Sequence, residues 1–184
     1  MALADLTSVA AVKSYCGVEG DADDVVIATL VTACSAWIRA WLNRDITTAS
    51  YDIRRSGRGT AALQLPQTPI RTIATLEVDG QPIPAQAAWG LPGFYHDDNQ
   101  VALVGQLFTR GIANIRIRYD AGYDVVPADI RQACNELVTL RYKLRDKAEW
   151  SSKSLAGETV SLVQKDMPAS VATLLQSWQT VVAL

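Results

Sequence analysis

The stretch ANIRIRYDAGYDVVPADI, residues 113–130, changes its residue pattern part-way and thereby indicates the fold class. In its first half, apolar residues alternate with Arg116 and Arg118, which is the two-residue period of a strand with one buried and one cationic face. Gly122 permits a turn, and Pro127 can occupy the first turn of a helix, where its missing N–H costs nothing. We therefore expect a strand, a glycine turn and a helix in immediate succession.

Apolar residues at three- and four-residue steps predict helices on both sides of the chain's middle. The first long helix is expected to begin at Asp21, and a shorter helix is expected ahead of it, over residues 3–15. The apolar stripe of the long helix comprises Ile27, Leu30, Val31, Cys34, Ile38, Trp41 and Leu42. The stripe that follows Pro127 comprises Ile130, Ala133, Cys134, Leu137, Leu140 and Leu144. Pro168 is expected to open a last helix.

The middle of the chain, residues 51–119, follows the two-residue period of strands. One predicted strand places Ile70, Thr72, Ala74, Leu76 and Val78 on one side, with Arg71, Thr75 and Glu77 on the other. Asp79-Gly80 then predicts a hairpin turn. The sequence therefore predicts an α+β fold, a helical bundle core with a β-rich insertion between the second and third helices. The expected division is residues 1–45 for the N-terminal helices, 46–122 for the insertion, 123–149 for a core helix, and 150–184 for a flexible arm and C-terminal helix.

The composition limits the classes of function that the protein can have. The chain has 184 residues and a formal net charge of −2, so a strongly basic, nucleic-acid-coating surface is not expected and any DNA contact must be local. Cys16, Cys34 and Cys134 are far apart in sequence and are interpreted as small buried hydrophobes in a reducing cytoplasm. The amino terminus does not resemble a secretion signal, and no apolar run reaches the roughly 18 residues that cross a bilayer.

Catalytic and cofactor motifs are sparse. His96 is the single histidine and is followed by Asp97, Asp98 and Asn99, a set that could bind a cation loosely but is more often a polar turn between two strands. The Gly57-Arg58-Gly59-Thr60 segment lacks the Lys-Ser/Thr of a phosphate-binding loop and does not lead from a strand into a helix. We expect no enzyme activity, cofactor or metal.

The tryptophans and arginines each allow two interpretations. Trp37 and Trp41 lie one helical turn apart and Trp178 lies on the last helix, so they serve either core packing or an oligomer interface. Arg54, Arg55, Arg58, Arg116 and Arg118 form the basic set of the strand region. Ion pairing with nearby aspartates is the default role of this set, and facing a DNA channel is the alternative, because mild positive charge eases the passage of phosphates.

The order of several short motifs resembles that of the phage head-to-tail connector (adaptor) family. The motifs are Trp41-Leu42-Asn43-Arg44, Leu63-Gln64-Leu65-Pro66 with Pro69-Ile70, Val78-Asp79-Gly80, the junction from Ile117 to Ile130, and Leu155-Ala156-Gly157-Glu158-Thr159-Val160-Ser161. The similarity covers nearly the whole chain, and the Tyr-x-Ala-Gly-Tyr to Pro-x-Asp-Ile junction is its most specific part.

This resemblance implies a structural virion protein at the neck, made in the host cytoplasm, that forms a closed ring, expected to hold twelve copies, beneath the portal. It implies contacts with the portal, with head-completion or tail proteins, and non-specifically with genomic DNA, and none with a membrane. The candidate interface residues are Trp37, Trp41, Trp150, Leu155, Val160, Leu162 and Trp178. A tail-completion or other assembly protein is the main alternative. A small hydrolase based on His96 and a host nucleic-acid-binding regulator are more distant.

Overall fold

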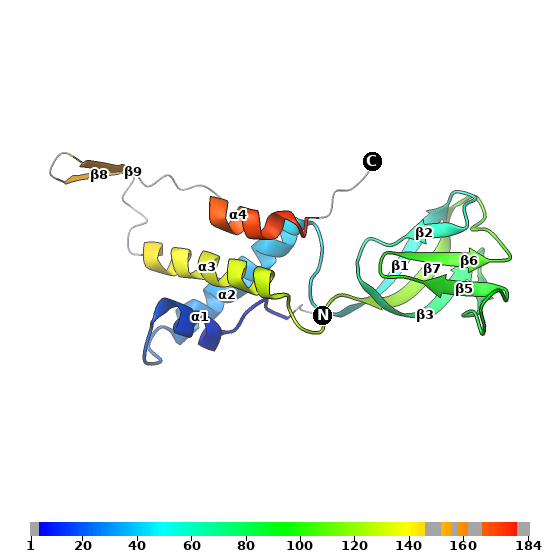
Figure 1. The fold of residues 1–184 in the computed structure, drawn as a ribbon, viewed down its shortest axis with the longest axis horizontal. Helices are drawn as coiled ribbons and strands as arrows, with labels where there is room; N and C mark the ends of the chain where they lie inside the picture. Colours follow the sequence, from blue (N-terminus) through cyan, green and yellow to red (C-terminus); the bar gives the residue numbers. More distant parts are fainter. Residues whose placement is uncertain (1–3, 146–151, 156–157, 162–166, 180–184) are drawn as a thin grey trace. The chain divides into compact units, whose positions relative to one another are not determined.

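A computed structural model describes residues 4–145, 152–155, 158–161 and 167–179 of the chain (Figure 1). The chain divides into two compact units. The helical unit comprises Ala2–Arg44 and Val126–Leu184, and the β unit comprises Asp45–Val125. The mixed α and β composition confirms the α+β class expected from the sequence.

Four helices make up the helical unit: α1 (Val9–Cys16), α2 (Asp24–Leu42), α3 (Ala128–Leu144) and α4 (Ala169–Gln176). Helix α3 packs against all of the other three, and α1 also packs against α2. The Ser8 side chain caps α1 by accepting a hydrogen bond from the Ala11 N–H at 3.2 Å. Gly17 ends that helix with a φ of +68°, a left-handed conformation that glycine adopts without steric cost.

The core of the helical unit is formed by one face of each helix. Fully buried members on α2 and α3 are Ile27, Val31, Cys34, Ile38, Leu42, Ile130, Ala133, Cys134, Leu137 and Val138. Four residues expected in these stripes do not belong to the buried core: Leu30, Trp41 and Leu144 are only half-buried, and Leu140 is 40% exposed. A three- or four-residue step places such side chains beside the buried face of the helix and not on it.

Burial also explains the chemistry of the cysteines. Burial raises the pKa of Cys34, and it raises the pKa of Cys134 to about 12, so both thiols stay protonated at neutral pH. The Cys134 Sγ lies 3.8 Å from the Ser35 Oγ, within the interior. The expectation that Cys34 and Cys134 act as small buried hydrophobes is therefore confirmed.

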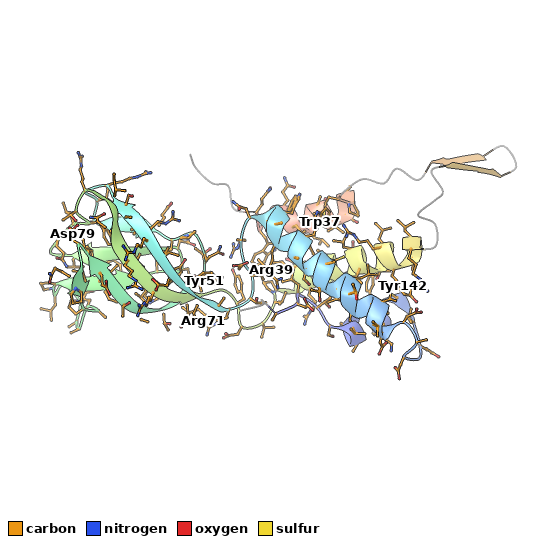
Figure 2. All side chains as sticks on the ribbon, turned by 180° about the vertical axis from the view of Figure 1, so that it is seen from behind. Trp37, Arg39, Tyr51, Arg71, Asp79 and Tyr142 are labelled. Atoms are coloured by element: carbon orange, nitrogen blue, oxygen red, sulfur yellow. The ribbon has the colours of Figure 1, made fainter. Side chains whose placement is uncertain are left out.

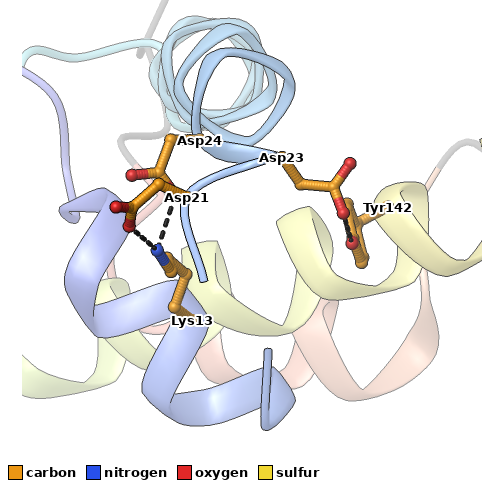
Figure 3. Close-up of polar contacts among 5 residues, drawn as sticks. All are labelled: Lys13, Asp21, Asp23, Asp24 and Tyr142. Carbon is orange, nitrogen blue, oxygen red and sulfur yellow. Dashed lines mark hydrogen bonds and ion pairs between the residues drawn. The ribbon is translucent and has the colours of Figure 1, made fainter. Parts of the chain in front are cut away.

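Acidic residues before α2 tie three helices together (Figure 3). Asp21 does not begin the helix as expected: α2 starts at Asp24, and no side chain caps it. The Lys13 Nζ on α1 lies 2.6 Å from the Asp24 Oδ1 and 3.2 Å from the Asp21 Oδ1. Tyr142 on α3 donates its hydroxyl hydrogen to the Asp23 Oδ2 at 2.6 Å. These carboxylates bind neighbouring helices instead of the helix's own N–H groups.

Helix α2 has a length and composition that would also allow it to span a bilayer, contrary to the expectation from the sequence. Core helices of water-soluble proteins pass the same test. Val31 and Ile38 are among the residues of α2 that are buried within the helical unit, and the polar Ser35 on that side accepts a hydrogen bond from the Leu6 N–H at 3.0 Å. Packing inside the unit therefore accounts for the buried apolar face of α2.

The β unit consists of two antiparallel sheets. The larger sheet has the strand order β1-β7-β3-β4, and the smaller sheet has the order β2-β6-β5. The strands are β1 (Ala49–Gly57), β2 (Ala62–Gln64), β3 (Ile70–Val78), β4 (Gln81–Ile83), β5 (Gly93–His96), β6 (Gln100–Val104) and β7 (Gly111–Ala121). The core between them draws on both sheets and comprises Leu65, Ile70, Leu76, Val78, Phe94, Val101, Leu103, Phe108, Ile115, Ile117, Tyr119 and Ala121.

The strand alternation follows the expectation except at irregular positions. The Asp79-Gly80 turn between β3 and β4 is confirmed, with φ values of +53° and +77° that suit a two-residue hairpin. Two register shifts in β3 break its alternation, so Ile73 packs against the core while Thr72 and Ala74 are exposed, which corrects their expected inward side. Ala113 is likewise exposed, because β7 begins irregularly there with a φ of +52°.

A further pair of strands, β8 (Ser152–Leu155) and β9 (Glu158–Ser161), forms an antiparallel hairpin. It falls within residues 150–167, for which the sequence predicted a loop or an arm without regular structure. Four-residue strands are too short to give a recognisable two-residue period. The remainder of that segment lies outside the described residues.

We predict that Ile38→Ala lowers the free energy of unfolding of the helical unit by about 2–5 kcal/mol, because the side chain is fully buried and its removal leaves a cavity. Leu30→Ala, the matched control on the same helix, should cost about half as much, since Leu30 is half-buried. Denaturant titrations followed by circular dichroism measure both. Equal losses would contradict the burial difference.

Candidate functional site

The larger sheet carries charged and polar residues on the side away from the core, which we call the outer strand face. Its members come from β1, β7 and β3, and the antiparallel register arranges them in rows across the three strands. The rows are Arg54, Arg116 and Glu77, then Asp52, Arg118 and Thr75, then Ser50, Asp120 and Thr72. Carboxylates therefore stand beside arginines on this face.

Asp52 is the centre of the outer strand face. Arg116 forms a two-point contact with it: the Arg116 Nε donates to the Asp52 Oδ1 at 3.0 Å and the Nη2 donates to the Oδ2 at 2.7 Å. The Arg118 Nε also donates to the Asp52 Oδ2, at 3.1 Å. Hydrogen bonding to Arg116, followed by that to Arg118, lowers the pKa of Asp52 to about 2.

Asp120 extends this network toward the next row. It accepts hydrogen bonds from the Ser50 hydroxyl at 2.6 Å and from the Thr72 hydroxyl at 2.9 Å, which lie on the two neighbouring strands. These bonds lower the pKa of Asp120, with Ser50 as the larger cause. Asp52 and Asp120 are therefore both ionised at neutral pH.

For Arg116 and Arg118 the structure shows the ion pairing with a nearby aspartate that was expected as the default role. Arg116 and Arg118 share one carboxylate, because the β1–β7 register places Asp52 opposite Arg118 and one row from Arg116. The alternation of Arg116 and Arg118 along one strand did not indicate which aspartate would be the partner. Asp52 lies on a different strand, and only the register brings the three side chains together.

The other three arginines of the basic set are exposed and lie on β1 or just after it: Arg54, Arg55 and Arg58. Within the described residues, no carboxylate lies at ion-pair distance from any of them. Arg54 belongs to the outer strand face, opposite Arg116. Arg55 and Arg58 lie at the edge of the sheet, where β1 has a neighbour on one side. The basic set thus divides into a face and an edge.

Three of the tryptophans expected at interfaces are half-buried within the helical unit. Trp37, labelled in Figure 2, is half-buried, and the Arg141 guanidinium lies 5.1 Å from the centre of its ring. Trp41 and Trp178 are also half-buried. Trp150 and Leu162 lie outside the described residues. Leu155 and Val160 lie in β8 and β9, whose side chains are not described.

The most exposed aromatic residue among the described ones is Trp89, which the sequence analysis did not single out. Its side chain is 92% exposed, in the segment between β4 and β5. A lone tryptophan among alanines, glycines and prolines carries no period that separates an exposed residue from a buried one. The lack of charged residues around it was the available signal.

Comparison with known protein families identifies the fold. Residues 5–181 match the family described as head completion protein. The chain belongs to the head completion protein family. This finding confirms the resemblance to head-to-tail connector proteins that the order of the motifs suggested. No curated protein matches the chain.

Solved structures of gene transfer agent (GTA) particles contain chains with the same fold. One is described as the neck of an empty GTA particle computed with C6 symmetry; it is 20% identical, with a TM-score of 0.60. A second is described as the neck of a native GTA particle computed with C12 symmetry, at 20% identity and a TM-score of 0.59. A third comes from the virion of a native GTA particle, at 21% identity and a TM-score of 0.60. Each match covers 100% of this chain and 98% of the other.

The residues that follow His96 form a turn, which agrees with membership in a family of structural virion proteins. Asp97 accepts hydrogen bonds from the Asn99 and Gln100 N–H groups, each at 2.8 Å, and these bonds lower its pKa. The Asp98 carbonyl accepts from the Ile70 N–H at 2.8 Å. The segment is a turn between β5 and β6 that holds β3 in place. Among the described residues, no three His, Cys, Asp or Glu side chains are grouped to hold a metal ion.

The glycine segment after β1 also has a structural explanation in this head completion protein. A Cβ at Gly57 would lie 1.8 Å from the Thr109 carbonyl oxygen, so only glycine fits that close approach. The Gly59 N–H donates to the Phe108 carbonyl at 2.9 Å, and the Phe108 N–H donates to the Thr60 carbonyl at 2.9 Å. The Gly59 N–H, one of the groups that a phosphate would need, is engaged in this pairing.

We predict that the Asp52 carboxyl titrates with a midpoint near pH 2, below its ordinary value of 3.8. Because the folded pKa is lowered, any stability from this carboxylate is present above about pH 3.8 and is lost as the pH falls through 2. In the Arg116→Gln/Arg118→Gln variant the midpoint should rise toward 3.8. Carbon-detected NMR titration measures it.

Asp79 is the internal control for this titration. Its pKa is lowered by hydrogen bonds from Thr109 and Asn114, without an arginine, so its midpoint should not move in the double variant. An Asp52 midpoint that stays near 2 without the arginines would contradict the assigned cause.

Proposed function

We propose that this head completion protein is a subunit of a closed ring that lies beneath the portal in the neck of a tailed particle and carries the DNA channel toward the tail. The match to the family over residues 5–181 is the observation that carries the proposal. The shared fold with GTA neck chains, over 100% of this chain and 98% of each of theirs, supports the same location. The subunit is made in the host cytoplasm and contacts the portal on one side and head-completion or tail proteins on the other.

Twelve copies are the expected number in the ring. The GTA neck structures were computed with C6 and C12 symmetry, and both symmetries are compatible with twelve subunits. A closed cyclic ring uses a heterologous interface, in which one patch of each subunit meets a different patch of the next. A chain with two compact units offers patches of distinct chemistry for that purpose.

Part of the basic set is proposed to line the DNA channel. The outer strand face presents Arg54, Arg116 and Arg118, yet the carboxylates of Asp52 and Asp120 on the same face offset much of their charge. A partly neutralised wall attracts phosphates weakly, and salt screens this attraction over about 8 Å under physiological conditions. Weak attraction suits a channel through which DNA must slide.

The segment of residues 150–167 is proposed to bind the portal. A two-stranded hairpin such as β8–β9 is marginally stable in water by itself, so contact with a partner would stabilise it. A segment that becomes ordered on a partner loses conformational entropy, and contacts with that partner must offset this loss. Because the portal would supply those contacts, the ring is expected to be stable only when the portal is present.

We predict that the purified protein is monomeric or weakly associated, and that it forms a stable ring when mixed with portal. Native mass spectrometry measures both states. A variant lacking residues 150–167 should keep its helical circular dichroism and lose portal binding. A wild-type chain that never forms a ring on the portal would contradict the proposed function. Full binding by the deletion variant would contradict only the role of the segment.

We predict that Arg116→Glu/Arg118→Glu lets particles assemble but impairs the retention or ejection of DNA, because the double change reverses the charge of the outer strand face. Arg116→Gln/Arg118→Gln should show a weaker form of the defect. This variant also removes the contacts with Asp52 without reversing charge, so it controls for misfolding around Asp52. Arg131→Glu/Lys143→Glu, on exposed positions of α3, is the charge-matched control. Packaged DNA per particle is the measurement, and an equal loss in the control would contradict a channel role.

A further inference from the structure

The segment between β4 and β5 forms an uncharged, exposed surface. No Asp, Glu, Lys or Arg occurs from Gln81 to His96. Trp89 is 92% exposed, and Leu91 and Tyr95 are also exposed. The Trp89 and Tyr95 rings lie 6.5 Å apart and are inclined to each other by 53°. We call the segment of residues 84–93, together with Tyr95, the Trp89 loop. An exposed aromatic cluster of this kind is typical of a binding surface.

The conformation of the Trp89 loop is held by its own hydrogen bonds. The Gln86 Nε2 donates to the Leu91 carbonyl at 2.9 Å, and the Leu91 N–H donates to the Ala88 carbonyl at 3.1 Å. At its base, the Gln86 N–H donates to the Phe94 carbonyl at 2.8 Å. The indole is therefore presented by a structured loop, so little conformational entropy is lost when a partner covers it.

The opposite edge of the same unit is basic. Strands β4 and β5 are the last strands of their sheets on one side, and β1 and β2 are the last strands on the other. Arg55 and Arg58 lie on or directly after β1, and no acidic residue occurs between Asp52 and Glu77. We call Arg55 and Arg58 the arginine edge. Its charge is not offset by neighbours along the chain.

Arg55 shows why the charge gathers at this edge. Its register partner on β7 is Ile115, a fully buried residue, so the alternation of β1 points Arg55 toward the core side. It is nevertheless exposed, because β1 is an edge strand and the long side chain can extend past it into solvent. The register shift between Arg55 and Gly57 then places Arg58 just beyond the end of the strand.

The Trp89 loop and the arginine edge flank the same row of the smaller sheet. The Leu103 N–H donates to the Ala61 carbonyl at 2.8 Å, and Leu103 pairs with Phe94 of β5 on its other side. Arg58 shortly precedes Ala61 in the chain, and the Trp89 loop runs directly into Phe94. The row formed by Ala61, Leu103 and Phe94 therefore begins shortly after the arginine edge and ends directly after the Trp89 loop.

We propose that the Trp89 loop of one copy packs against the arginine edge of the next copy, with a guanidinium group over the indole ring. The inference rests on the proposed ring and assigns one of its subunit interfaces. Two different patches at opposite edges are what a heterologous cyclic interface requires. Arginine stacked on tryptophan is a favourable cation–π pair in proteins. Trp89 is 92% exposed and has a tilted contact with Tyr95, and no ion pair holds Arg55 or Arg58 among the described residues.

Opposite charge changes at Trp89 test the proposal. Trp89→Lys should weaken ring formation on the portal by about tenfold or more, because it places a cation against Arg55 and Arg58. Trp89→Glu should retain ring formation within about threefold, because a carboxylate can pair with the same arginines. Arg55→Glu/Arg58→Glu should restore ring formation to the Trp89→Lys chain. Val125→Lys, at a 73% exposed position of the same unit, is the matched control and should have no effect.

A disulfide provides a second readout that does not depend on charge. Mild oxidation of assembled particles should link neighbouring copies of a Trp89→Cys/Arg58→Cys chain into a covalent ladder, whereas each single variant should give no ladder. Cys34 and Cys134 are buried and should not interfere, whereas the half-buried Cys16 is replaced by serine in all of these chains.

The possible results distinguish a failure of this interface proposal from a failure of the proposed ring. Equal losses in Trp89→Lys and Trp89→Glu without rescue, and no ladder, would mean that an apolar pocket of another protein binds the loop, which overturns the proposal. Unchanged assembly of Trp89→Lys would overturn it as well. In both cases a ring formed by the wild-type chain leaves the proposed function intact. Absence of any ring in the wild type would refute the proposed function, and this inference with it.

Discussion

The β unit depends on the pairing of β7 with a strand on each side. This strand of 11 residues lies between β1 and β3 in the larger sheet. Its inward residues Ile115, Ile117 and Tyr119 are almost fully buried, so a shift of register by one residue would move all of them to solvent. The same register fixes which residues of β1 and β3 stand beside Arg116 and Arg118. Core packing on one side of β7 thus determines the electrostatics on the other.

The polar contacts of both units connect elements that are distant in sequence. In the β unit, Asp52 holds two arginines of β7, and Asp120 holds hydroxyls from β1 and β3. In the helical unit, Asp24 at the start of α2 binds Lys13 of α1, and Asp23 just before it binds Tyr142 of α3. Surface ion pairs of this kind contribute little to stability one by one. Their main effect is on the surface, where they remove charge that would otherwise attract a partner.

Exposed arginines without an acidic neighbour and exposed aromatic residues lie in separate places on the β unit. Arg54, Arg55 and Arg58 have no acidic neighbour at ion-pair distance in the described structure, and the Trp89 loop contains no charge. A subunit of a closed ring needs two unlike patches and a wall that does not hold DNA tightly. The partly neutralised outer strand face fits the wall, and the two edges of the β unit fit the patches. The proposed ring, its channel and its interface therefore draw on different parts of one small unit.

The sequence alone determined the class of fold and the positions of the main elements, because these depend on local periodicity and on turn residues. The α2 and α3 stripes, the Asp79-Gly80 turn and the strand–turn–helix junction at Gly122 are all local patterns. The order of such motifs also sufficed to suggest the family that residues 5–181 confirm.

Only the tertiary structure decided which side chains meet. The sharing of Asp52 by Arg116 and Arg118, the exposure of Thr72 in irregular β3, and the half-burial of Leu30 all depend on strand register or on the neighbour that a face meets. Trp89 lies in a stretch without a period that would predict its exposure, and a turn stabilised by Gln86 holds it in solvent. Periodicity predicts the direction of a side chain relative to its own element, whereas contacts between elements depend on how those elements pack.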